Sequence, residues 1–503
     1  MKAYLMRGSA AALILSCSAQ VALADLTARD VWSDWRDYMT GTGYQLTADE
    51  SMSGNTLSVR NLTLSIQLPE NGGLVSIRLE ELALTENGDG SVSLVMPERM
   101  PIRIDTTGGE AEVKAVFNLL QSGASLRISG TPGDMTQDYK AATATIAYDS
   151  MTVDGDPLPP EAMRAGATLR NVSTSTHMLR GENRSYDQTG GADMLDYDLA
   201  FQDPNSEDMG AFKGSVQDLR FESKSVIPTD LNADDLSQML RAGFGFDARV
   251  SFGAGSGSAS GKGEGEEFTL SSASQGGAVA VAMNGGHVSY DVSQDQTEIT
   301  VQTAEVPFPI SFAMQRIGFA LDLPLARSDE EQPFSFGLTL AEFTMPEQLW
   351  GIFDPGAVLP RDPATIVVDL AGKVRLLADL LDPAIAESDS APGELNALTI
   401  KDLQISAAGA SLTGTGDFIF DNTDMESFDG VPAPEGTADL KLVGANGLID
   451  KLIQMGLMSD QDAMGARMTM GMIGVPGDAP DTLNSHIEIN HQRQILANGQ
   501  RLK

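Results

Sequence analysis

A short pattern of apolar positions recurs along the chain. Two apolar residues at positions i and i+2 are followed by two more at i+5 and i+7, so a three-residue step separates the two pairs. Each half of the pattern is typical of a β-strand with one apolar face, because side chains alternate between the faces of a strand. The step reverses the phase, and a β-bulge restores it while bending the strand. The copies are Leu57/Val59/Leu62/Leu64, Ile77/Leu79/Leu82/Leu84, Ile146/Tyr148/Met151/Val153, Phe312/Met314/Ile317/Phe319 and Leu398/Ile400/Leu403/Ile405, with a weaker one at Gly214/Val216/Leu219/Phe221.

Bent strands of this kind, spread over the whole chain, predict a mainly β protein. We expect a long, curved, bulged antiparallel sheet with a few short helices packed on it. The apolar positions of three copies are the candidate lining of a groove, or the core of the sheet. These positions are Leu57, Val59, Leu62, Leu64, Phe312, Met314, Ile317, Phe319, Leu398, Ile400, Leu403 and Ile405.

Helices are predicted at the start of the chain, in the middle and near the end. In residues 25–40, Trp32, Trp35 and Met39 share one helical face. This face either plugs one end of the sheet or anchors the protein to a partner or a membrane surface. The other predicted helices are 232–241 with an Asn232 cap, a short helix between Pro346 and Pro355, and a helical hairpin near 446–470 whose second helix begins after Ser459.

The helix at 232–241 divides the mature chain into two β-rich halves, 25–240 and 241–503, which could equally form one continuous domain. Just after it, residues 251–267 alternate glycine with small residues. This stretch is either a flexible linker or a strand that packs closely against its neighbour, and we favour the strand.

The first residues predict a secretory signal that ends before Asp25. Lys2 and Arg7 form a basic region, an apolar segment follows, and 22–24 is a small-x-small cleavage site. Cleavage after Ala24 predicts a periplasmic protein. Cys17 sits in a partial lipidation motif whose leucine is one position too close, so a lipid anchor and a retained N-terminal anchor are the alternatives. After the signal, no apolar stretch is long enough to span a membrane.

The amino-acid composition excludes several kinds of functional site and partner. Cys17 is the only cysteine, so a cleaved chain has no disulfide, thiolate nucleophile or zinc–thiolate site. The formal net charge is −37, which excludes nucleic acid as a partner and disfavours anionic lipid headgroups. We interpret this charge as an adaptation for solubility, since no segment resembles a calcium-binding loop.

The sequence contains few candidate catalytic or metal-binding residues, so we expect no enzymatic activity, no cofactor and no metal. His486 and His491 are the only histidines close in sequence, and on a strand they would point to opposite faces. Met464, Met468 and Met472 share one helical face, which would either bind copper(I) or pack on the sheet. Phosphate-loop and serine-hydrolase motifs are absent from the sequence.

The bulged strands, the helical hairpin, the C-terminal Asn498-Gly499 turn and the segment 346–363 also carry a family resemblance. In that segment, Trp350-Gly351-Ile352-Phe353-Asp354-Pro355 precedes Leu359-Pro360-Arg361-Asp362-Pro363. The chain resembles the alphaproteobacterial envelope family called domain of unknown function 2125, which is similar to the AsmA-like group of elongated β-sheet proteins. The resemblance implies an envelope role and brings no catalytic residues. AsmA-like proteins are typically tethered by an N-terminal membrane helix, whereas this chain is predicted to be cleaved.

We therefore expect a non-enzymatic periplasmic protein. By its resemblance to AsmA-like proteins, it would hold a lipid or another apolar ligand in a groove of the sheet. The first alternative is a ligand-free scaffold that binds an envelope protein. The second is a secreted enzyme acting on polysaccharide, which the aromatic content of 6% disfavours because sugar sites use aromatic stacking.

Overall fold

A computed structural model describes residues 25–67, 73–108, 111–228, 236–263, 266–382, 385 and 391–503. Within these residues the chain forms one antiparallel sheet of 27 strands and five short helices. The predicted fold class is therefore confirmed. The predicted signal, with Cys17, and the predicted cap Asn232 lie outside the described residues.

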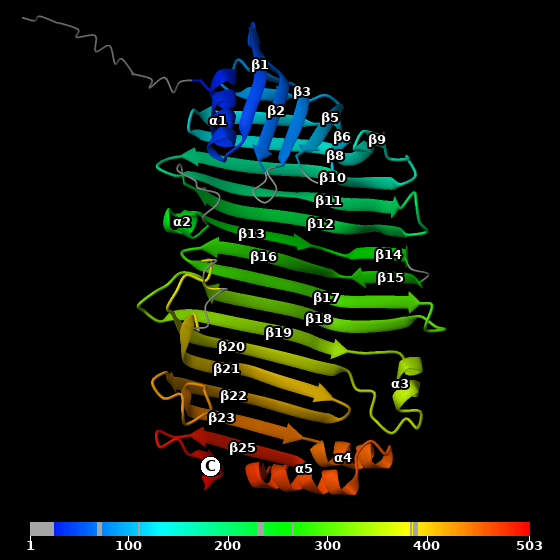
Figure 1. Ribbon diagram of the computed structural model, residues 1–503, viewed down its shortest axis with the longest axis vertical. Coiled ribbons are helices and arrows are strands. Elements are labelled where there is room, and N and C mark those ends of the chain that lie inside the picture. The colour runs from blue at the N-terminus through cyan, green and yellow to red at the C-terminus, as the bar shows by residue number, and fades with distance from the viewer. Residues whose placement is uncertain are drawn as a thin grey trace, which may run out of the picture.

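The first part of the chain begins with a helix and continues as antiparallel strands, of which β8, β10, β11 and β12 are the longest (Figure 1). Its elements are α1 (Ala28–Gly41), β1 (Gln45–Ser53), β2 (Thr56–Gln67), β3 (Leu74–Glu86), β4 (Val92–Val95), β5 (Arg99–Thr107), β6 (Val113–Ser122), β7 (Ser125–Thr131), β8 (Asp134–Val153), β9 (Asp156–Pro157), β10 (Met163–Arg180), β11 (Arg184–Gln202) and β12 (Met209–Ile227).

The second part continues the same sheet and ends in a helical hairpin. Its elements are α2 (Leu236–Arg241), β13 (Gly245–Phe252), β14 (Gly255–Gly263), β15 (Glu266–Ser274), β16 (Gly276–Asn284), β17 (His287–Thr303), β18 (Ile310–Pro324), β19 (Gln332–Phe343), α3 (Glu347–Phe353), β20 (Ala364–Leu376), β21 (Gly393–Ala407), β22 (Ala410–Asp421), β23 (Ala433–Val443), α4 (Ala445–Gln454), α5 (Asp460–Ile473), β24 (Val475–Pro476), β25 (Thr482–Ile489), β26 (Ile495–Ala497) and β27 (Gln500–Arg501).

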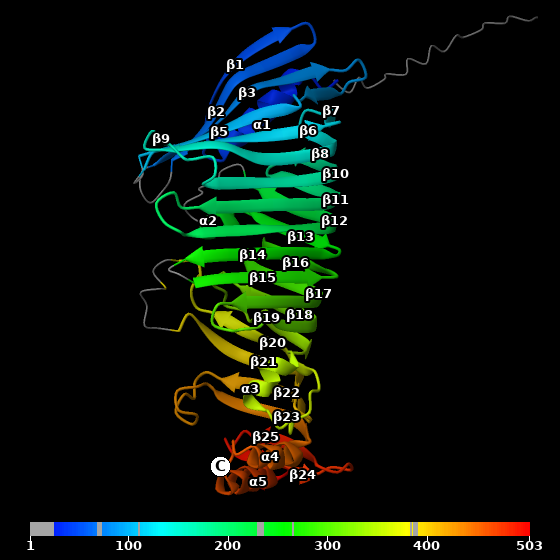
Figure 2. The same ribbon diagram turned by 90° about the vertical axis from the view of Figure 1, so that its right-hand side faces the viewer.

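At two levels, the partner of a long strand is split into two short strands. One half of β12 pairs with β13 and the other half with β14, and β17 likewise pairs with both β16 and β15. Hydrogen-bonded pairing therefore runs without a break from β12 to β17. In the view of Figure 2, β14 and β15 lie to one side of β13 and β16, so the two halves of the sheet form different walls.

A crease crosses the sheet and separates these walls. It follows strand residues in the left-handed conformation and shifts in pairing register. The left-handed residues are Asn61, Asn171, Asp218, Gln296 and Glu342, with φ between 49° and 53°. Register shifts fall at the predicted steps in 146–153 and 398–405. In the copies at 57–64 and 214–221, the step instead contains a left-handed residue. The pairing register of β2 with β3 and of β12 with β11 is kept there, because both strands kink at the same level.

Polar side chains occupy the outer side of the crease. The amide Nδ2 of Asn61 donates to Asp49 Oδ2 at 2.7 Å, and that of Asn171 donates to Asp193 Oδ2 at 2.7 Å. Asparagine tolerates the left-handed conformation better than most residues. All five left-handed residues are exposed, whereas Val172 and Ala192 on the other side of the sheet are buried. The sheet therefore bends toward the face that carries Val172 and Ala192.

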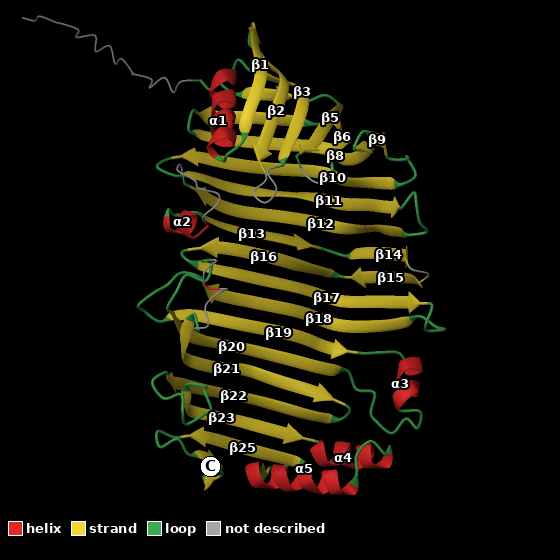
Figure 3. Cartoon of the chain, viewed as in Figure 1, coloured by secondary structure: helices red, strands yellow, loops and turns green. Residues whose placement is uncertain are grey.

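The two faces of the sheet differ in chemistry. The convex face carries cross-strand ion pairs, including Arg164–Asp198, Arg170–Asp196 and Lys401–Asp369. The concave face, which we call the trough, carries the apolar positions of the recurring pattern. Figure 3 shows that the helices lie at the ends and edges of the sheet, so no helical layer covers the middle of the trough.

The main core lies at the N-terminal end of the trough, under α1. Trp32 and Val31 pack against Leu57, Val59 and Leu84 in a cluster of buried side chains. The helix begins with a capping box between Thr27 and Asp30. The interpretation of this helix as a plug is therefore confirmed.

A buried ion pair holds the plug to the sheet. Both Nη atoms of Arg184, in β11, donate to the carboxylate of Asp34, at 2.9 and 2.7 Å. Asp34 is 5% exposed and Arg184 is 8% exposed. The guanidinium also lies 5.4 Å from the centre of the Tyr38 ring. This fork-like geometry joins residues that are far apart in the sequence.

The opposite end of the sheet carries α4 and α5, whose bounds agree with the predicted hairpin. One detail differs from expectation. Met464, Met468 and Met472 are exposed rather than packed on the sheet, because α5 packs against β25 with its other side and turns this face to solvent.

The helix α3 stands at the edge of the sheet on a hydrogen-bonded connector. The buried carboxylate of Asp354 accepts from the backbone N–H groups of Val358 and Leu359, both at 2.9 Å, and from Arg361. The Arg361 guanidinium lies 4.3 Å from the centre of the Trp350 ring. Burial alone would raise the pKa of Asp354, but these donors outweigh it and the pKa is lowered.

None of the helices in the described part of the chain has the length and apolar character needed to cross a membrane.

We predict that Asp34→Ala lowers the free energy of unfolding by about 3 kcal/mol, because it leaves the Arg184 charge buried without a partner. Urea unfolding followed by tryptophan fluorescence measures this, since Trp32 and Trp35 in α1 are two of the three tryptophans. Arg103→Gln, which removes an exposed pair with Glu80, is the matched control and should leave the midpoint unchanged. Equal midpoints for all three proteins would contradict the proposed role of the buried pair.

We also predict that Asp354→Asn loosens the α3 connector. Because the pKa of Asp354 is lowered on folding, its stabilisation is present above the unfolded value of 3.8 and is lost as pH falls below it. At neutral pH, hydrogen-exchange mass spectrometry should show faster exchange across 345–363 in the variant and no change in α1. Asp362→Asn, at an exposed neighbour, is the control. Unchanged exchange in Asp354→Asn would show that the carboxylate does not hold the connector.

Candidate functional site

The trough beyond the plug is apolar and open to solvent. Cross-strand partners place its side chains on one face from β11 to β22. Large apolar side chains on this face are exposed in spite of their position inside the bend: Leu199, Phe201, Phe212, Val250, Phe268, Val279, Tyr290, Val292, Phe319, Ile366 and Ile405. An exposed apolar surface of this extent normally marks a binding site.

The predicted lining residues fall into two groups. Leu57, Val59 and Leu62 are buried in the core beneath α1, and Leu64 packs against it. The structure does not bring these four residues to an open surface. The other eight lie in the open trough on β18 and β21, where Phe319 and Ile405 are exposed and the others are half-buried, namely Phe312, Met314, Ile317, Leu398, Ile400 and Leu403.

Aromatic residues of the trough lie opposite glycines on the neighbouring strand. Directly paired residues include Tyr197 with Gly214, Phe201 with Gly210 and Phe268 with Gly261. A Cβ atom on Gly210 would meet the Phe201 ring at 2.3 Å, and one on Gly261 would meet the Phe268 ring at 2.5 Å. Glycine is therefore needed at these positions to let each ring lie across its neighbouring strand. Such pairs stabilise glycine-containing sheets.

The preferred interpretation of the glycine-rich stretch is thus confirmed, since β14 spans Gly255–Gly263 and pairs on both sides. The side chains that β14 turns to the trough belong to Gly255, Gly257, Ala259 and Gly261. This strand presents almost bare backbone, so its neighbours can extend their rings over it.

A groove of about 620 Å³ opens at this part of the trough. It is formed by the ends of β10, β11, β12, β14 and β15. Its volume is in the range of sites for small organic ligands, roughly 300–1,000 Å³. Apolar residues that line it include Met163, Leu199, Phe201, Met209, Phe212 and Phe268.

Charged residues stand at the rim of the groove. Arg164 and Lys262 belong to its lining, and each forms an ion pair, with Asp198 at 3.0 Å and with Glu207 at 2.5 Å. The hydrogen bond from Lys262 lowers the pKa of Glu207 and raises that of Lys262, which keeps both groups ionised. The convex face of the same strands instead forms a polar depression lined by serine, threonine and charged residues.

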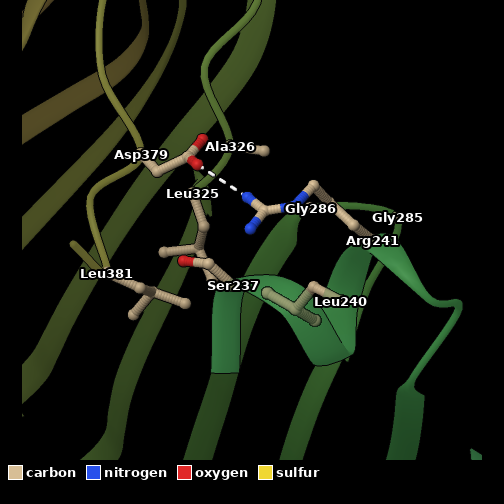
Figure 4. Close-up of a pocket in the computed structure, with 9 residues that line it drawn as sticks. All are labelled: Ser237, Leu240, Arg241, Gly285, Gly286, Leu325, Ala326, Asp379 and Leu381. Carbon is tan, nitrogen blue, oxygen red and sulfur yellow. Dashed lines mark hydrogen bonds and ion pairs between the residues drawn. The ribbon is translucent and has the colours of Figure 1, made fainter. Parts of the chain in front are cut away.

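A smaller cavity of about 210 Å³ lies at the edge of the sheet beside α2 (Figure 4). Leu240, Leu325 and Leu381 surround it, and Arg241 reaches across to Asp379 at 2.9 Å. Asp379 also accepts from the backbone N–H of Arg327 at 2.8 Å. These contacts tie α2 to two loops, and we interpret the cavity as a by-product of this joint.

Metal-binding clusters do not form among the described residues. Within them, no group of three or more histidine, cysteine or acidic side chains is placed to hold a metal ion. His177, His287 and His486 each pair with an aspartate on an adjacent strand of the convex face. In contrast, the trough offers an apolar surface and a few polar groups at its rim, which suit binding rather than bond-breaking chemistry.

Sequence reasoning missed the aromatic residues of the groove. Tyr197 and Phe201 belong to a strictly alternating stretch, and the glycines of β14 are conspicuous in the sequence. The missing information was strand pairing, because only the register between β11, β12 and β14 shows that rings and glycines meet.

Comparison with known proteins gives one match. None of the curated proteins or solved structures matches the chain. A family described as "Uncharacterized protein conserved in bacteria (DUF2125)" matches residues 197–492, which is more than half of the chain and includes most of the open trough. The chain therefore belongs to the DUF2125 family.

Proposed function

We propose that the protein is an exported, non-enzymatic protein of the bacterial envelope that holds a lipid or another apolar ligand in its trough. The observation that carries this proposal is the uncovered apolar face of the sheet beyond the plug. Phe201 and Phe268 are 59% and 47% exposed although they lie on the concave face. Exposed aromatic rings cost free energy in water, and an apolar occupant would recover it.

The shape of the trough supports an elongated ligand. Strands from β10 to β25 stack side by side, and neighbouring strands are about 4.8 Å apart. The core under α1 closes one end, while no helix of the described residues covers the middle of the trough. An acyl chain could lie along or across this surface without displacing any packed element.

The charge of the chain bears on the polar part of the ligand. With a net charge of −37, the protein repels an anionic headgroup over short distances. We therefore propose a neutral or zwitterionic amphiphile. The resemblance to AsmA-like envelope proteins supports the same class of ligand, by analogy of architecture alone.

A second candidate is a scaffold that binds a partner protein. The exposed face of α5, formed by Met464, Met468 and Met472, favours it, because methionine-rich surfaces are common at adaptable protein interfaces. The two candidates differ in the location of the binding surface. A lipid would bind in the trough, whereas a partner protein would bind at α5.

A charge inside the trough should expel the ligand. We predict that Ile405→Glu lowers the affinity for cis-parinaric acid and for fluorescent phosphatidylcholine by about tenfold, because a carboxylate must then be desolvated beside the ligand. Ile419→Glu is the matched control: it lies on the next strand, is 60% exposed against 43% for Ile405, and faces the convex side. Fluorescence titration measures both variants, and the control should change affinity less than about twofold.

Native mass spectrometry with lipid extraction, on protein purified from the periplasm, provides the complementary measurement. We expect copurified phospholipid or fatty acid near one molecule per chain. A ligand-free mass, together with no uptake of either fluorescent probe, would overturn the proposal and favour the scaffold.

A further inference from the structure

The groove at the ends of β11, β12, β14 and β15 gathers several aromatic rings within one cavity. Tyr197 lies flat along the sheet, since its hydroxyl comes close to where a Cβ would stand on Gly214 of the adjacent strand and on Gly257 of the strand beyond. The Tyr197 and Phe212 rings are stacked, with centroids 4.9 Å apart and an interplanar angle of 23°. Phe201 and Phe268 lie over glycines in the same way.

These four residues, Tyr197, Phe201, Phe212 and Phe268, form an aromatic platform. Phe201, Phe212 and Phe268 each leave about half of their surface exposed and line the groove of about 620 Å³. Between them, β14 contributes Ala259 and Gly261, which rise little above the backbone. The platform is therefore mainly a surface of ring faces and backbone within a cavity, and Leu199, between Tyr197 and Phe201 on β11, is the large aliphatic side chain among these rings.

A surface of ring faces selects among apolar ligands. A flexible acyl chain gains about as much from leucine as from phenylalanine, because its gain follows buried area, and it loses conformational freedom when it is ordered. A rigid flat ring system loses less freedom and adds the stacking contribution of each aromatic face. The chemistry of the platform thus favours a rigid, flat occupant.

The charged groups of this groove stand at its edge. Lys262 near the end of β14 and Arg164 near the start of β10 contribute to its lining, whereas the alternation of β14 turns Ser260 to the convex face. The ammonium group of Lys262 has three donors, of which one is taken by Glu207 at 2.5 Å. A hydroxyl or carbonyl group at one end of the ligand can therefore accept a hydrogen bond at the rim while its ring body covers the platform.

We infer that the aromatic platform binds a flat, fused-ring apolar molecule with a single neutral polar end, such as a polycyclic alcohol. This inference rests on the proposed function, and it names the class of ligand that this part of the trough takes. The rest of the trough keeps the capacity for acyl chains.

The test compares two fluorescent probes on the full chain: dehydroergosterol, a fused-ring alcohol, and cis-parinaric acid, a linear chain. Phe201→Leu combined with Phe268→Leu keeps the apolar character but removes two stacking faces. We expect the affinity for dehydroergosterol to fall about tenfold, and that for cis-parinaric acid to change less than about twofold. Phe334→Leu, which removes a ring paired with Gly372 outside the groove, is the control and should change neither affinity.

Each result decides one of the two proposals. Binding of cis-parinaric acid without binding of dehydroergosterol would overturn the inference and leave the proposed function standing. So would an equal effect of the double variant on both probes. Failure of both probes to bind would overturn the proposed function itself. If the double variant does not fold, as judged by circular dichroism, the two single variants replace it, each with an expected loss of about threefold in dehydroergosterol affinity.

Discussion

The structure depends on one geometric requirement: each long strand must bend sharply and still keep its apolar side chains on one face. A strand that merely curved would keep its alternation, whereas a strand that kinks at one residue reverses it. The three-residue step in the sequence compensates for that reversal. Because the kinks of neighbouring strands lie side by side, they form one crease, and the polar residues at the crease, such as Asn61 and Asn171, face outward to water.

The crease also explains why the trough is open. A sheet of this length has two broad faces, and the helices at its ends and edges are too few to cover either. Stability must then come from backbone pairing, from cross-strand contacts worth roughly 0.2–1 kcal/mol each, from the main core under α1, and from a smaller buried cluster around Val172. The convex face meets water with ion pairs, whereas the concave face meets it with aromatic rings that are laid over glycines.

Much of this architecture was predictable because it is local in the sequence. The strand pattern, the plug with Trp32 on its inner face, the short helix after Pro346 and the helix after Ser459 follow from periodicity and capping. The candidate groove was only partly predictable. Leu57 and Phe319 are both apolar positions of the same recurring pattern, yet one is buried beneath α1 and the other is exposed. Their difference comes from which element lies above them, and no pattern within a strand contains that information.

The same reason accounts for the residues that were missed. Phe268 and Gly261 lie close together in the sequence, but Tyr197 reaches Gly257 only across an intervening strand. The methionines of α5 illustrate the opposite error: their spacing indicates a single helical face, and spacing alone does not tell whether that face meets protein or water.

The meander has a consequence for how such a protein can change over evolution. Each strand from β18 to β22 pairs only with the strand before it and the strand after it, so this part of the molecule is assembled in one dimension, like a repeat protein. Adding or deleting one hairpin in the middle would lengthen or shorten the trough and leave the plug, the crease and the end helices unchanged. The length of the trough can thus change independently of the chemistry of its lining. Relatives could differ in the length of the trough while sharing the same cross-section.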